Sequence, residues 1–506
     1  MPANVTKKLS ALSTGVGLVL LCYMAYATIY GPYKTTFVHL AIFALCSFVA
    51  LFLDSIIQNI GSKFGILKNF SLLVASVSVI GYFIIEFERL INLWGSTYLS
   101  SWDILLGGFF VIICIEASWR QSLVLGALAV TSCLYMLFGD YLPGVFSHAG
   151  MDFERFIYIV VYTSEGLFGT GLKVAATYLF MFVILGSVLR VTKTGDFMID
   201  MANGLLGSKV GGAAKGAMAA SAGLGTIVGS SIGNVLATGT FTIPLMKRTG
   251  FEPHVAAAVE TNTSEGAQLV PPILGASAFI MAQLTGIPYE VIALAAVVPA
   301  SLYYLSLYSV VHIEALKHNI SGLPEEEIPS IKKTFTRGWH LLVAPISLFY
   351  LLLVGSYTVT FASLIAIFIA VFFGLLRKHT RFSVKELITF LSEGLSQSAR
   401  ITALVISIGL IQAAIVATGL GPRLTDIILD FSNGSLLMTA SLTVVAATVL
   451  GMGMPTPITY LLLAMFAAPA LIECGSTVLS AHLFLFYFAI KSGSTPPVAL
   501  VAVVAA

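Results

Sequence analysis

Long apolar runs separated by short polar breaks make up most of the chain. The first run extends from Ala11 to Tyr30, and a helix needs ~20 apolar residues to cross a bilayer. This run is long for a signal sequence and lacks an A-x-A cleavage site, so we interpret it as the first span. Further runs lie at about 35–53, 69–87, 103–117, 121–141, 171–190, 210–246, 254–283, 287–313, 339–356, 359–376, 398–420, 436–474 and 480–506. The pattern predicts an all-α polytopic membrane protein.

Two polar segments suggest how the spans are grouped. The segment FSHAGMDFERF follows the fifth run and separates a leading part, 1–150, from a second part, 151–506. The longest hydrophilic insert, KHNISGLPEEEIPSIKKTFTRG, divides the second part. We therefore expect two transport repeats at about 171–310 and 398–506, joined by scaffold helices at about 311–397. Amphipathic interfacial helices are predicted at 197–206 and 382–395.

The distribution of Lys and Arg orients these spans. Cations near span ends mark the cytoplasmic side, and most of them fall there when the amino terminus is placed inside. The count requires Lys209 and Lys247 to share one side, so the run 210–246 must enter the membrane and turn back. The run 436–474 must enter and return from the outside. Two re-entrant hairpins of opposite orientation are typical of the inverted repeats of secondary transporters.

Composition narrows the class of protein. Only 10% of the residues are charged and 58% are hydrophobic, whereas a soluble domain carries roughly 25% charged residues. A net charge of +2 argues against a nucleic-acid partner. The apolar composition makes membrane lipid the expected surroundings of the chain. The five cysteines lack metal-ligand spacing, and neither H-E-x-x-H nor G-x-x-x-x-G-K-[ST] occurs. We therefore expect that the protein is neither an enzyme nor an ATP-driven pump.

Four stretches rich in Gly, Ser, Thr and Pro carry the candidate chemistry. They are the hairpin tips GSSIGN (229–234) and GMGMPTP (451–457) and the helix interruptions TNTSEGAQLVPP (261–272) and KSGSTPP (491–497). Gly and Pro within a membrane free backbone groups that must be buried in protein or line a cavity. Hard oxygen donors for a small cation are Ser230, Ser231, Asn234, Thr263, Ser264, Thr456, Ser494 and Thr495. The alternative is close helix packing by small residues, since 229–233 fits G-x-x-x-G.

At these stretches the chain resembles a known family. SEGLFG (164–169), SSIGNVLATGTFTIPLMKRTGF (230–251), the first interruption with its flanks (259–289), LGMGMPTPITYLLLA (450–464) and AHLFLFYFAIKSGSTPPVAL (481–500) resemble the large membrane subunit of tripartite ATP-independent periplasmic (TRAP) transporters. About 150 residues rich in apolar runs precede this part. The chain therefore resembles the fused four-helix plus twelve-helix subunit that partners TAXI-type receptors.

The resemblance implies an elevator-type importer of the bacterial inner membrane, monomeric and multi-pass. A periplasmic TAXI-type receptor would deliver an organic acid such as 2-oxoglutarate, glutamate or a C4-dicarboxylate, and a sodium or proton gradient would drive uptake. Apart from bound sodium ions, no cofactor is implied. By motif match, the coupling-ion residues are Ser230, Ser264, Gly266, Gly453, Ser492 and Thr495, and Glu265 joins them as a candidate because of its charge. The substrate-binding residues are Ser231, Asn234, Gln268, Thr456 and Lys491.

Two charges depart from the family pattern. Glu265 stands where a small neutral residue is usual, and Lys491 stands where an apolar residue is usual. A charge at that depth costs at least ~2.5 to 3.5 kcal/mol and is a functional hypothesis by default. Glu265 is either a proton-coupling carboxylate, with Lys491 as its partner or as the substrate anchor, or a sodium ligand with Lys491 near the cavity mouth. The third interpretation is a structural pair or two snorkelling side chains.

Two other functions remain open from the residues alone. Residues 229–233 match G-x-S-x-G, so an intramembrane serine protease would use Ser231 as nucleophile and His254 or His482 as base. An ion channel is the second alternative, although paired interrupted hairpins favour an occluded site. The chain ends at Ala506 inside an apolar run where the family continues, which fits either a truncation or a shortened natural product.

Overall fold

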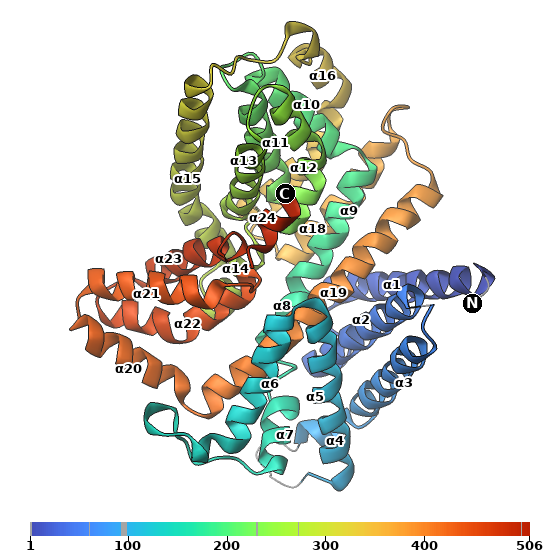
Figure 1. Cartoon of the computed structure of the whole chain (residues 1–506). Coiled ribbons are helices and arrows are strands. Elements are labelled where there is room, and N and C mark those ends of the chain that lie inside the picture. Colours follow the sequence, from blue (N-terminus) through green and yellow to red (C-terminus); the bar gives the residue numbers. More distant parts are fainter. Residues whose placement is uncertain (1–2, 60, 93–98, 229–230, 272, 497) are drawn as a thin grey trace. The chain divides into compact units, whose positions relative to one another are not determined.

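The computed structural model describes residues 3–59, 61–92, 99–228, 231–271, 273–496 and 498–506. Throughout these ranges the regular elements are helices, and no strand occurs in them (Figure 1). The chain divides into two compact units, each built from segments that are far apart in the sequence. Unit 1 comprises residues 1–183 with 391–427, and unit 2 comprises residues 184–390 with 428–506.

Unit 1 joins the leading helices to one later segment. Its elements are α1 (Ala3–Tyr30), α2 (Thr36–Gln58), α3 (Lys63–Ile85), α4 (Phe87–Asn92), α5 (Ser101–Gln121), α6 (Leu123–Phe138), α7 (Phe153–Tyr162), α8 (Thr170–Val174), the first part of α9 (Phe180–Val191), most of α19 (Val384–Ala417) and the start of α20 (Leu420–Ser432). A group of fully buried aromatic rings holds this unit together. Phe110 stacks on Phe168 with ring centroids 5.5 Å apart, and Phe83 meets Phe110 edge-on at the same distance.

Unit 2 contains the four stretches that the sequence analysis singled out. Its elements are the rest of α9, α10 (Thr194–Leu206), α11 (Gly212–Val228), α12 (Ser231–Arg248), α13 (Pro253–Gly266), α14 (Ala276–Thr285), α15 (Tyr289–Lys317), α16 (Ile331–Gly338), α17 (Val343–Leu353), α18 (Val359–Leu375), α21 (Leu436–Gly451), α22 (Thr456–Glu473), α23 (Val478–Ile490) and α24 (Leu500–Ala505), with the first residues of α19 and the last residues of α20.

Each predicted hairpin of unit 2 consists of two helices that pack together. Helices α11 and α12 lie on either side of 229–230, and α21 and α22 lie on either side of 452–455. The second turn contains Gly453 at a φ of 76°, a left-handed conformation that favours glycine. The helical pairs fit the expected hairpins, and their re-entrant course in a membrane stays a prediction.

Each predicted interruption also separates two helices. Helix α13 ends at Gly266, a short 3-10 turn follows over 267–269, and α14 begins only at Ala276. Helix α23 ends at Ile490, a second 3-10 turn covers 491–493, and α24 begins at Leu500. Gly and Pro explain both breaks locally, because glycine lowers helix stability and proline cannot donate a backbone hydrogen bond.

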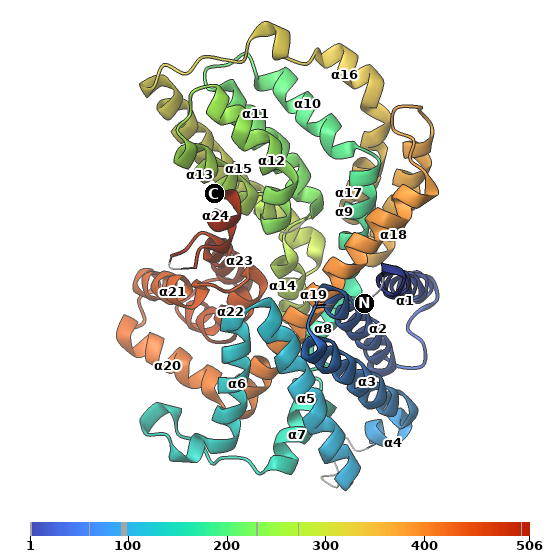
Figure 2. The same cartoon turned by 45° about the vertical axis from the view of Figure 1, so that its right-hand side comes forward.

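The two halves of unit 2 pack against each other at these breaks. The last helix, α24, packs against α12 and α13, and α14 packs against α22 and α23 (Figures 1 and 2). The 3-10 turn 491–493 packs against both helices of the second pair, α21 and α22. Segments on each side of the long hydrophilic insert therefore build one common centre.

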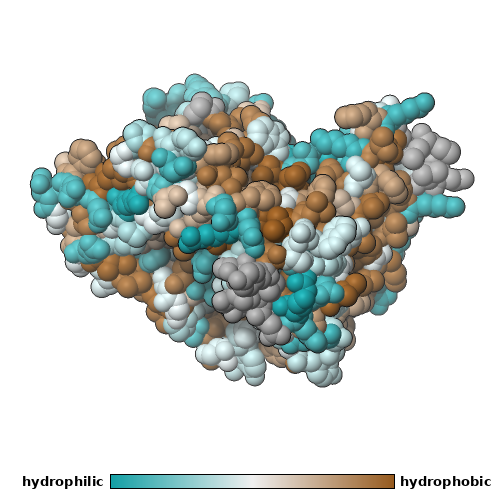
Figure 3. All heavy atoms as spheres, turned by 90° about the horizontal axis from the view of Figure 1, so that it is seen from below, coloured by the Kyte–Doolittle hydropathy of each residue, from teal (hydrophilic) through white to brown (hydrophobic). Residues whose placement is uncertain are grey.

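The helix lengths and the surface agree with a multi-pass membrane protein. Ten of the described helical stretches are long and apolar enough to span a bilayer, and four shorter apolar helices accompany them. Large apolar side chains lie exposed, among them Phe64, Ile85 and Leu437 at 78–80%, and brown apolar areas separate the polar clusters in Figure 3. One expectation changes: residues 384–417 form a single helix of 34 residues, so no separate amphipathic helix ends near 395.

Candidate functional site

Lys491 and Glu265 meet at the junction of the two interruptions. Lys491 opens the 3-10 turn after α23, and Glu265 lies in the last turn of α13. The ammonium Nζ of Lys491 lies 3.3 Å from Glu265 Oε2, and it donates hydrogen bonds of 2.8 Å to Asn262 Oδ1 and to the hydroxyl of Tyr303. An ammonium has three N–H donors, so these three partners use all of them.

Tyr303 orients this cluster. Its hydroxyl donates to the backbone carbonyl of Asn262 at 2.8 Å, and therefore accepts from Lys491. The Lys491 ammonium also lies 4.8 Å from the centre of the Tyr303 ring, within the range of a cation–π interaction. Helix α15 thus holds the lysine through the hydroxyl and the ring of one residue, Tyr303.

The two charged side chains differ in their access to solvent. The Glu265 side chain is 0% exposed, whereas the Lys491 side chain is 33% exposed. Ser494 donates a hydrogen bond of 3.0 Å to Glu265 Oε2, but Oε1 has no hydrogen-bond partner among the described residues. A buried carboxylate oxygen without a donor is energetically costly, so this atom is suited to receive a proton or a cation.

Close packing leaves little room around Glu265. A side-chain Cβ at Gly493 would lie 3.0 Å from Glu265 Oε1 and 2.5 Å from Val501 Cγ2, and one at Gly266 would collide with the Tyr303 ring. Any group that binds Oε1 must therefore be small.

A second buried carboxylate lies one turn earlier on α13. Glu260 is 0% exposed and accepts hydrogen bonds from the hydroxyls of Thr238 and Thr242 on α12, the second at 2.6 Å. The hydroxyl of Ser264 lies 3.4 Å from Glu260 Oε1. Hydroxyls rather than a positive charge surround this group among the described residues.

Asn234 links Glu260's surroundings to α11. Its Nδ2 donates to the Ser221 hydroxyl at 2.7 Å, to the Ser221 carbonyl at 3.1 Å and to the Ser264 hydroxyl at 3.3 Å. Its Oδ1 is buried and has no partner in the described part of the chain. Helices α11, α12 and α13 therefore share one polar cluster.

The remaining predicted residues occupy varied positions. Ser231 and Thr456 are buried at the first residues of α12 and α22, and Gln268 is buried in the turn after α13. Ser492 is buried against Gly451, and Thr495 donates to the Lys491 carbonyl at 2.7 Å. Among the described residues, no hydrogen bond joins Ser231, Thr456 or Gly453 to either carboxylate cluster. Ser230 lies outside the described residues.

Six residues of these clusters were not predicted from the sequence: Glu260, Asn262, Tyr303, Ser221, Thr238 and Thr242. A signal for Glu260 was available, because an acid within a predicted span is a functional hypothesis and Thr238 and Thr242 are spaced i, i+4 on the preceding helix. Tyr303 gave no such signal, since an aromatic residue in an apolar run usually packs in a core or against lipid.

The residues proposed for a protease are not assembled. His482 Nδ1 is hydrogen-bonded to the Tyr460 hydroxyl at 2.8 Å inside unit 2, and His254 is exposed beside Glu252. Neither histidine is therefore held as a base for Ser231.

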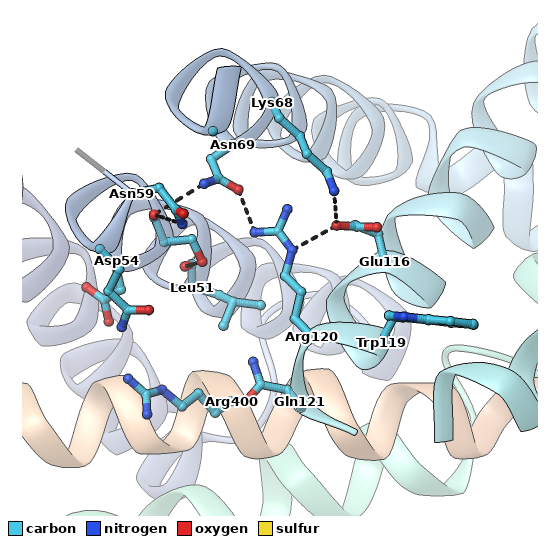
Figure 4. A pocket seen from close by; sticks show the side chains of 13 residues that line it. Leu51, Asp54, Asn59, Lys68, Asn69, Glu116, Trp119, Arg120, Gln121 and Arg400 are labelled. Atoms are coloured by element: carbon cyan, nitrogen blue, oxygen red, sulfur yellow. Dashed lines mark hydrogen bonds and ion pairs between the residues drawn. The ribbon is translucent and has the colours of Figure 1, made fainter. Parts of the chain in front are cut away.

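Charged residues at helix ends in unit 1 pair with one another. A polar cavity of about 670 Å³ (Figure 4) contains Glu116, which accepts from Lys68 at 2.8 Å and from Arg120 at 2.9 Å. On the same cavity wall, Asp54 accepts from Ser396 at 2.6 Å and from Ser13 at 2.8 Å. These contacts join α1, α2, α3, α5 and α19 and agree with a structural role.

Another pair fixes the start of α5. Arg89 on α4 donates to Asp103, which also caps α5 together with Ser100. Hydrogen bonds to Asp103 and Glu86 raise the pKa of Arg89 above its usual value, so this guanidinium stays charged.

Comparison with known proteins shows to which family the chain belongs. Residues 106–506 match the model of the tripartite ATP-independent periplasmic transporter, DctM component. The chain belongs to this TRAP transporter family. A putative TRAP transporter large permease protein of Haemophilus influenzae is 24% identical over 296 residues, which are 58% of this chain and 68% of that protein.

Family membership establishes the coarse function of the chain. It is a permease for secondary solute uptake that works with a periplasmic substrate-binding protein, and the family is a transporter family rather than a class of enzymes. Together with the ten long apolar helices, this makes the chain a multi-pass membrane protein.

Proposed function

We propose that this permease takes up an organic acid, with Lys491 as the anchor for its carboxylate. The substrate class is a carboxylate such as 2-oxoglutarate, glutamate or a C4-dicarboxylate, and a sodium or proton gradient drives uptake. The observation that supports this most directly is Lys491 itself, a partly exposed ammonium at the junction of two helix interruptions.

The geometry suggests how substrate and coupling ion are linked. Lys491 already uses its three donors, and the contact with Glu265, at 3.3 Å, is longer than those with Asn262 and Tyr303. A substrate carboxylate would therefore replace Glu265 at the ammonium. Glu265 would then be a buried carboxylate without a cation, which costs several kcal/mol, so a proton or a sodium ion must bind it.

This exchange couples substrate binding at Lys491 to cation binding at Glu265 without requiring contact between the substrate and the cation. The anion is bound well only when Glu265 is neutralised, and Glu265 is neutralised readily only when Lys491 turns to the anion. Ser264, Gly266, Ser492 and Thr495 would complete a sodium site, whereas a proton would need Glu265 alone. One cation moved inward through 100 mV contributes ~2.3 kcal/mol.

Residues 230–234 and 451–457 complete the proposal. We infer that both helical pairs are re-entrant and that unit 2 carries the substrate in an elevator movement, since both interruptions and both pairs meet within it. Ser231, Asn234, Gln268 and Thr456 would contact the parts of the substrate beyond its carboxylate.

The leading helices support a fused subunit of the TAXI type. Residues 1–105 precede the part of the chain that matches the family, and their helices pack within unit 1 with residues 391–427. We propose that 1–150 acts as the small subunit, with 106–150 also included in the family match. We further propose that helices at about 311–397 connect the repeats and that a TAXI-type receptor delivers the substrate to a monomeric permease. The amino terminus would lie in the cytoplasm of a bacterial cell.

Uptake into proteoliposomes tests this proposal. The receptor and a labelled carboxylate are added outside, and sodium and proton gradients are imposed separately for the wild type, Glu265→Gln and Lys491→Gln. Glu252→Gln is the matched control, because Glu252 precedes the same helix and is exposed.

Each result has a definite meaning. Loss of uptake in Lys491→Gln with the control unchanged supports the anchor. Proton-driven uptake that Glu265→Gln abolishes assigns coupling to that carboxylate, while sodium-driven uptake that survives assigns it to the hydroxyls and carbonyls nearby. Full uptake by Lys491→Gln would refute the anchor.

A further inference from the structure

A buried lysine that the transport proposal does not use lies at the start of α11. Lys215 is 1% exposed and is among the largest fully buried side chains of the chain. Its neighbours in sequence are glycine and alanine, in the segment GGAAKGAMAA. A lysine at such a position is costly unless a partner compensates its charge.

The contacts of Lys215 are polar or aromatic but not anionic. Its Nζ lies 3.0 Å from Nδ1 of His312 and 4.5 Å from the centre of the Tyr308 ring, both on α15. An ammonium can only donate, so Nδ1 of His312 accepts this hydrogen bond. Among the described residues no carboxylate lies within ion-pair distance of Lys215. Two of its N–H donors therefore remain available.

An apolar cavity adjoins this lysine. It has a volume of about 540 Å³, within the range of ligand-binding cavities. Its walls come mainly from successive turns of α11 and α15, with Met218, Ala222 and Val297 among them, and Phe349 of α17 also lines it. Lys215 is the charged residue in this lining.

The cavity also reaches the first interruption. Val270 and Pro271, which follow the 3-10 turn after α13, form part of its wall. Tyr304, another lining residue, donates a hydrogen bond of 2.8 Å to the backbone carbonyl of Thr263. A bound molecule would touch the segment that carries Glu265, from a cavity whose lining does not include Lys491.

We propose that this cavity binds a membrane-derived amphiphilic carboxylate, a fatty acid. The apolar walls accept the hydrocarbon tail, and the carboxylate accepts hydrogen bonds from the free N–H groups of Lys215 and neutralises its charge. Selectivity rests on the head group, because a tail that leaves lipid for an apolar wall gains little. This site is independent of the proposed carboxylate transport and would exist even if Lys491 had another role.

Photolabelling of the full-length permease in lipid nanodiscs tests the site. The probe is dodecanoate with a diazirine in its tail, and cross-linked peptides are identified by mass spectrometry. We expect labels on the peptides that contain Met218, Val297 or Phe349. Labelling by the methyl ester of the same probe should be about tenfold weaker or less, since it lacks the charge-assisted hydrogen bonds.

Three variants separate the charge from the cavity. Lys215→Gln should lose the preference for the acid over the ester, while Lys209→Gln, an exposed lysine six residues earlier, should keep it. Ala219→Phe places a ring in the cavity without removing the charge and should abolish labelling by both probes. Each variant is first checked for an unchanged elution volume, and Ala219→Phe supplies the answer if Lys215→Gln does not fold.

Two outcomes would overturn the proposal. Equal labelling by acid and ester in the wild type would show a lipid groove that does not recognise a carboxylate. Labels that persist at the same peptides in Ala219→Phe would show that the probe binds elsewhere on the surface. Because the readout is binding and not uptake, failure here leaves the transport proposal untouched, and failure of uptake leaves this one untouched.

Discussion

Glu260 and Glu265 are buried in the same helix, five residues apart, yet they are stabilised in different ways. Glu260 is surrounded by hydroxyls of α12 and of its own helix in the first half of unit 2. Glu265 depends on a lysine that is 226 residues away in the sequence, and one of its oxygens has no donor among the described residues. The first arrangement is closed, whereas the second can exchange partners. This difference supports our proposal that Glu265 is the group that responds to substrate.

Among these variants, replacing Lys491 should have the largest effect on stability and uptake. In Lys491→Met, Glu265 becomes a buried carboxylate without a cation, and we expect a loss of about 3 to 5 kcal/mol in stability together with loss of uptake. Thermal unfolding in detergent and uptake into proteoliposomes measure the two effects. The double variant Glu265→Gln with Lys491→Met should regain much of the stability but not the uptake. A single variant as stable as the wild type would contradict the ion pair.

Removing a hydroxyl donor tests the closed arrangement around Glu260. Thr242→Val keeps the shape of the side chain but removes the hydrogen bond of 2.6 Å, so we expect a destabilisation of about 1 to 3 kcal/mol. Thr131→Val is the control, because that exposed hydroxyl bonds only to its own helix in unit 1. Equal unfolding temperatures for the two variants would argue against a role of Thr242 at Glu260.

Glycine substitutions compare the space around the two carboxylates. In Gly493→Ala the new methyl group would lie 2.5 Å from Val501 and 3.0 Å from Glu265, so we expect a cost of about 1 to 3 kcal/mol. In Gly239→Ala the nearest atoms would be Ile243 Cδ1 at 3.3 Å, the end of a flexible side chain, and Glu260 Cγ at 3.4 Å, and alanine favours a helix. Thermal unfolding should therefore fall in the first variant and stay level or rise in the second. The reverse order would contradict the packing around Glu265.

Outside both carboxylate clusters, His379 should make a small pH-dependent contribution to stability, which provides a baseline for the variants above. Partial burial and the nearby Arg337 guanidinium lower the pKa of His379, which donates a hydrogen bond of 3.0 Å to the Arg337 carbonyl. The unfolded chain then binds more protons below the ordinary histidine pKa of about 6.5, so His379 lowers stability as the pH falls through that value. His379→Gln should unfold at the wild-type temperature at pH 8 and slightly above it at pH 5.5. An equal difference at both values would exclude titration of His379 as the cause.

The local features of unit 2 were largely predictable. Apolar runs of sufficient length predicted the helices, and the Gly- and Pro-rich stretches predicted the turn at 452–455 and both interruptions, because these residues act on the backbone where they stand. The boundary near 395 was wrong in detail: the amphipathic segment continues into the apolar one, since nothing between them ends a helix, and α19 runs from Val384 to Ala417.

The buried polar clusters of unit 2 were harder to predict from the sequence. Glu265 and Lys491 stood out as charges, but several interpretations of them remained open because their separation in space was unknown. Glu260 was overlooked because its hydroxyl partners lie on another helix and carry no charge. Lys215 was overlooked because a single lysine near a helix start looks like a cytoplasmic anchor when its burial is unknown.

The sequence by itself determined that this protein is helical and membrane-embedded, where its helices break, and to which family it belongs, since apolar length and helix-breaking residues act locally. Only the tertiary structure decided which polar groups meet. Lys491 reaches Glu265, Asn262 and Tyr303 because α13, α15 and the end of α23 converge, and Lys215 meets His312 because α11 packs on α15. The strength of a buried charge contact depends on distance and surroundings, and helix packing determines both.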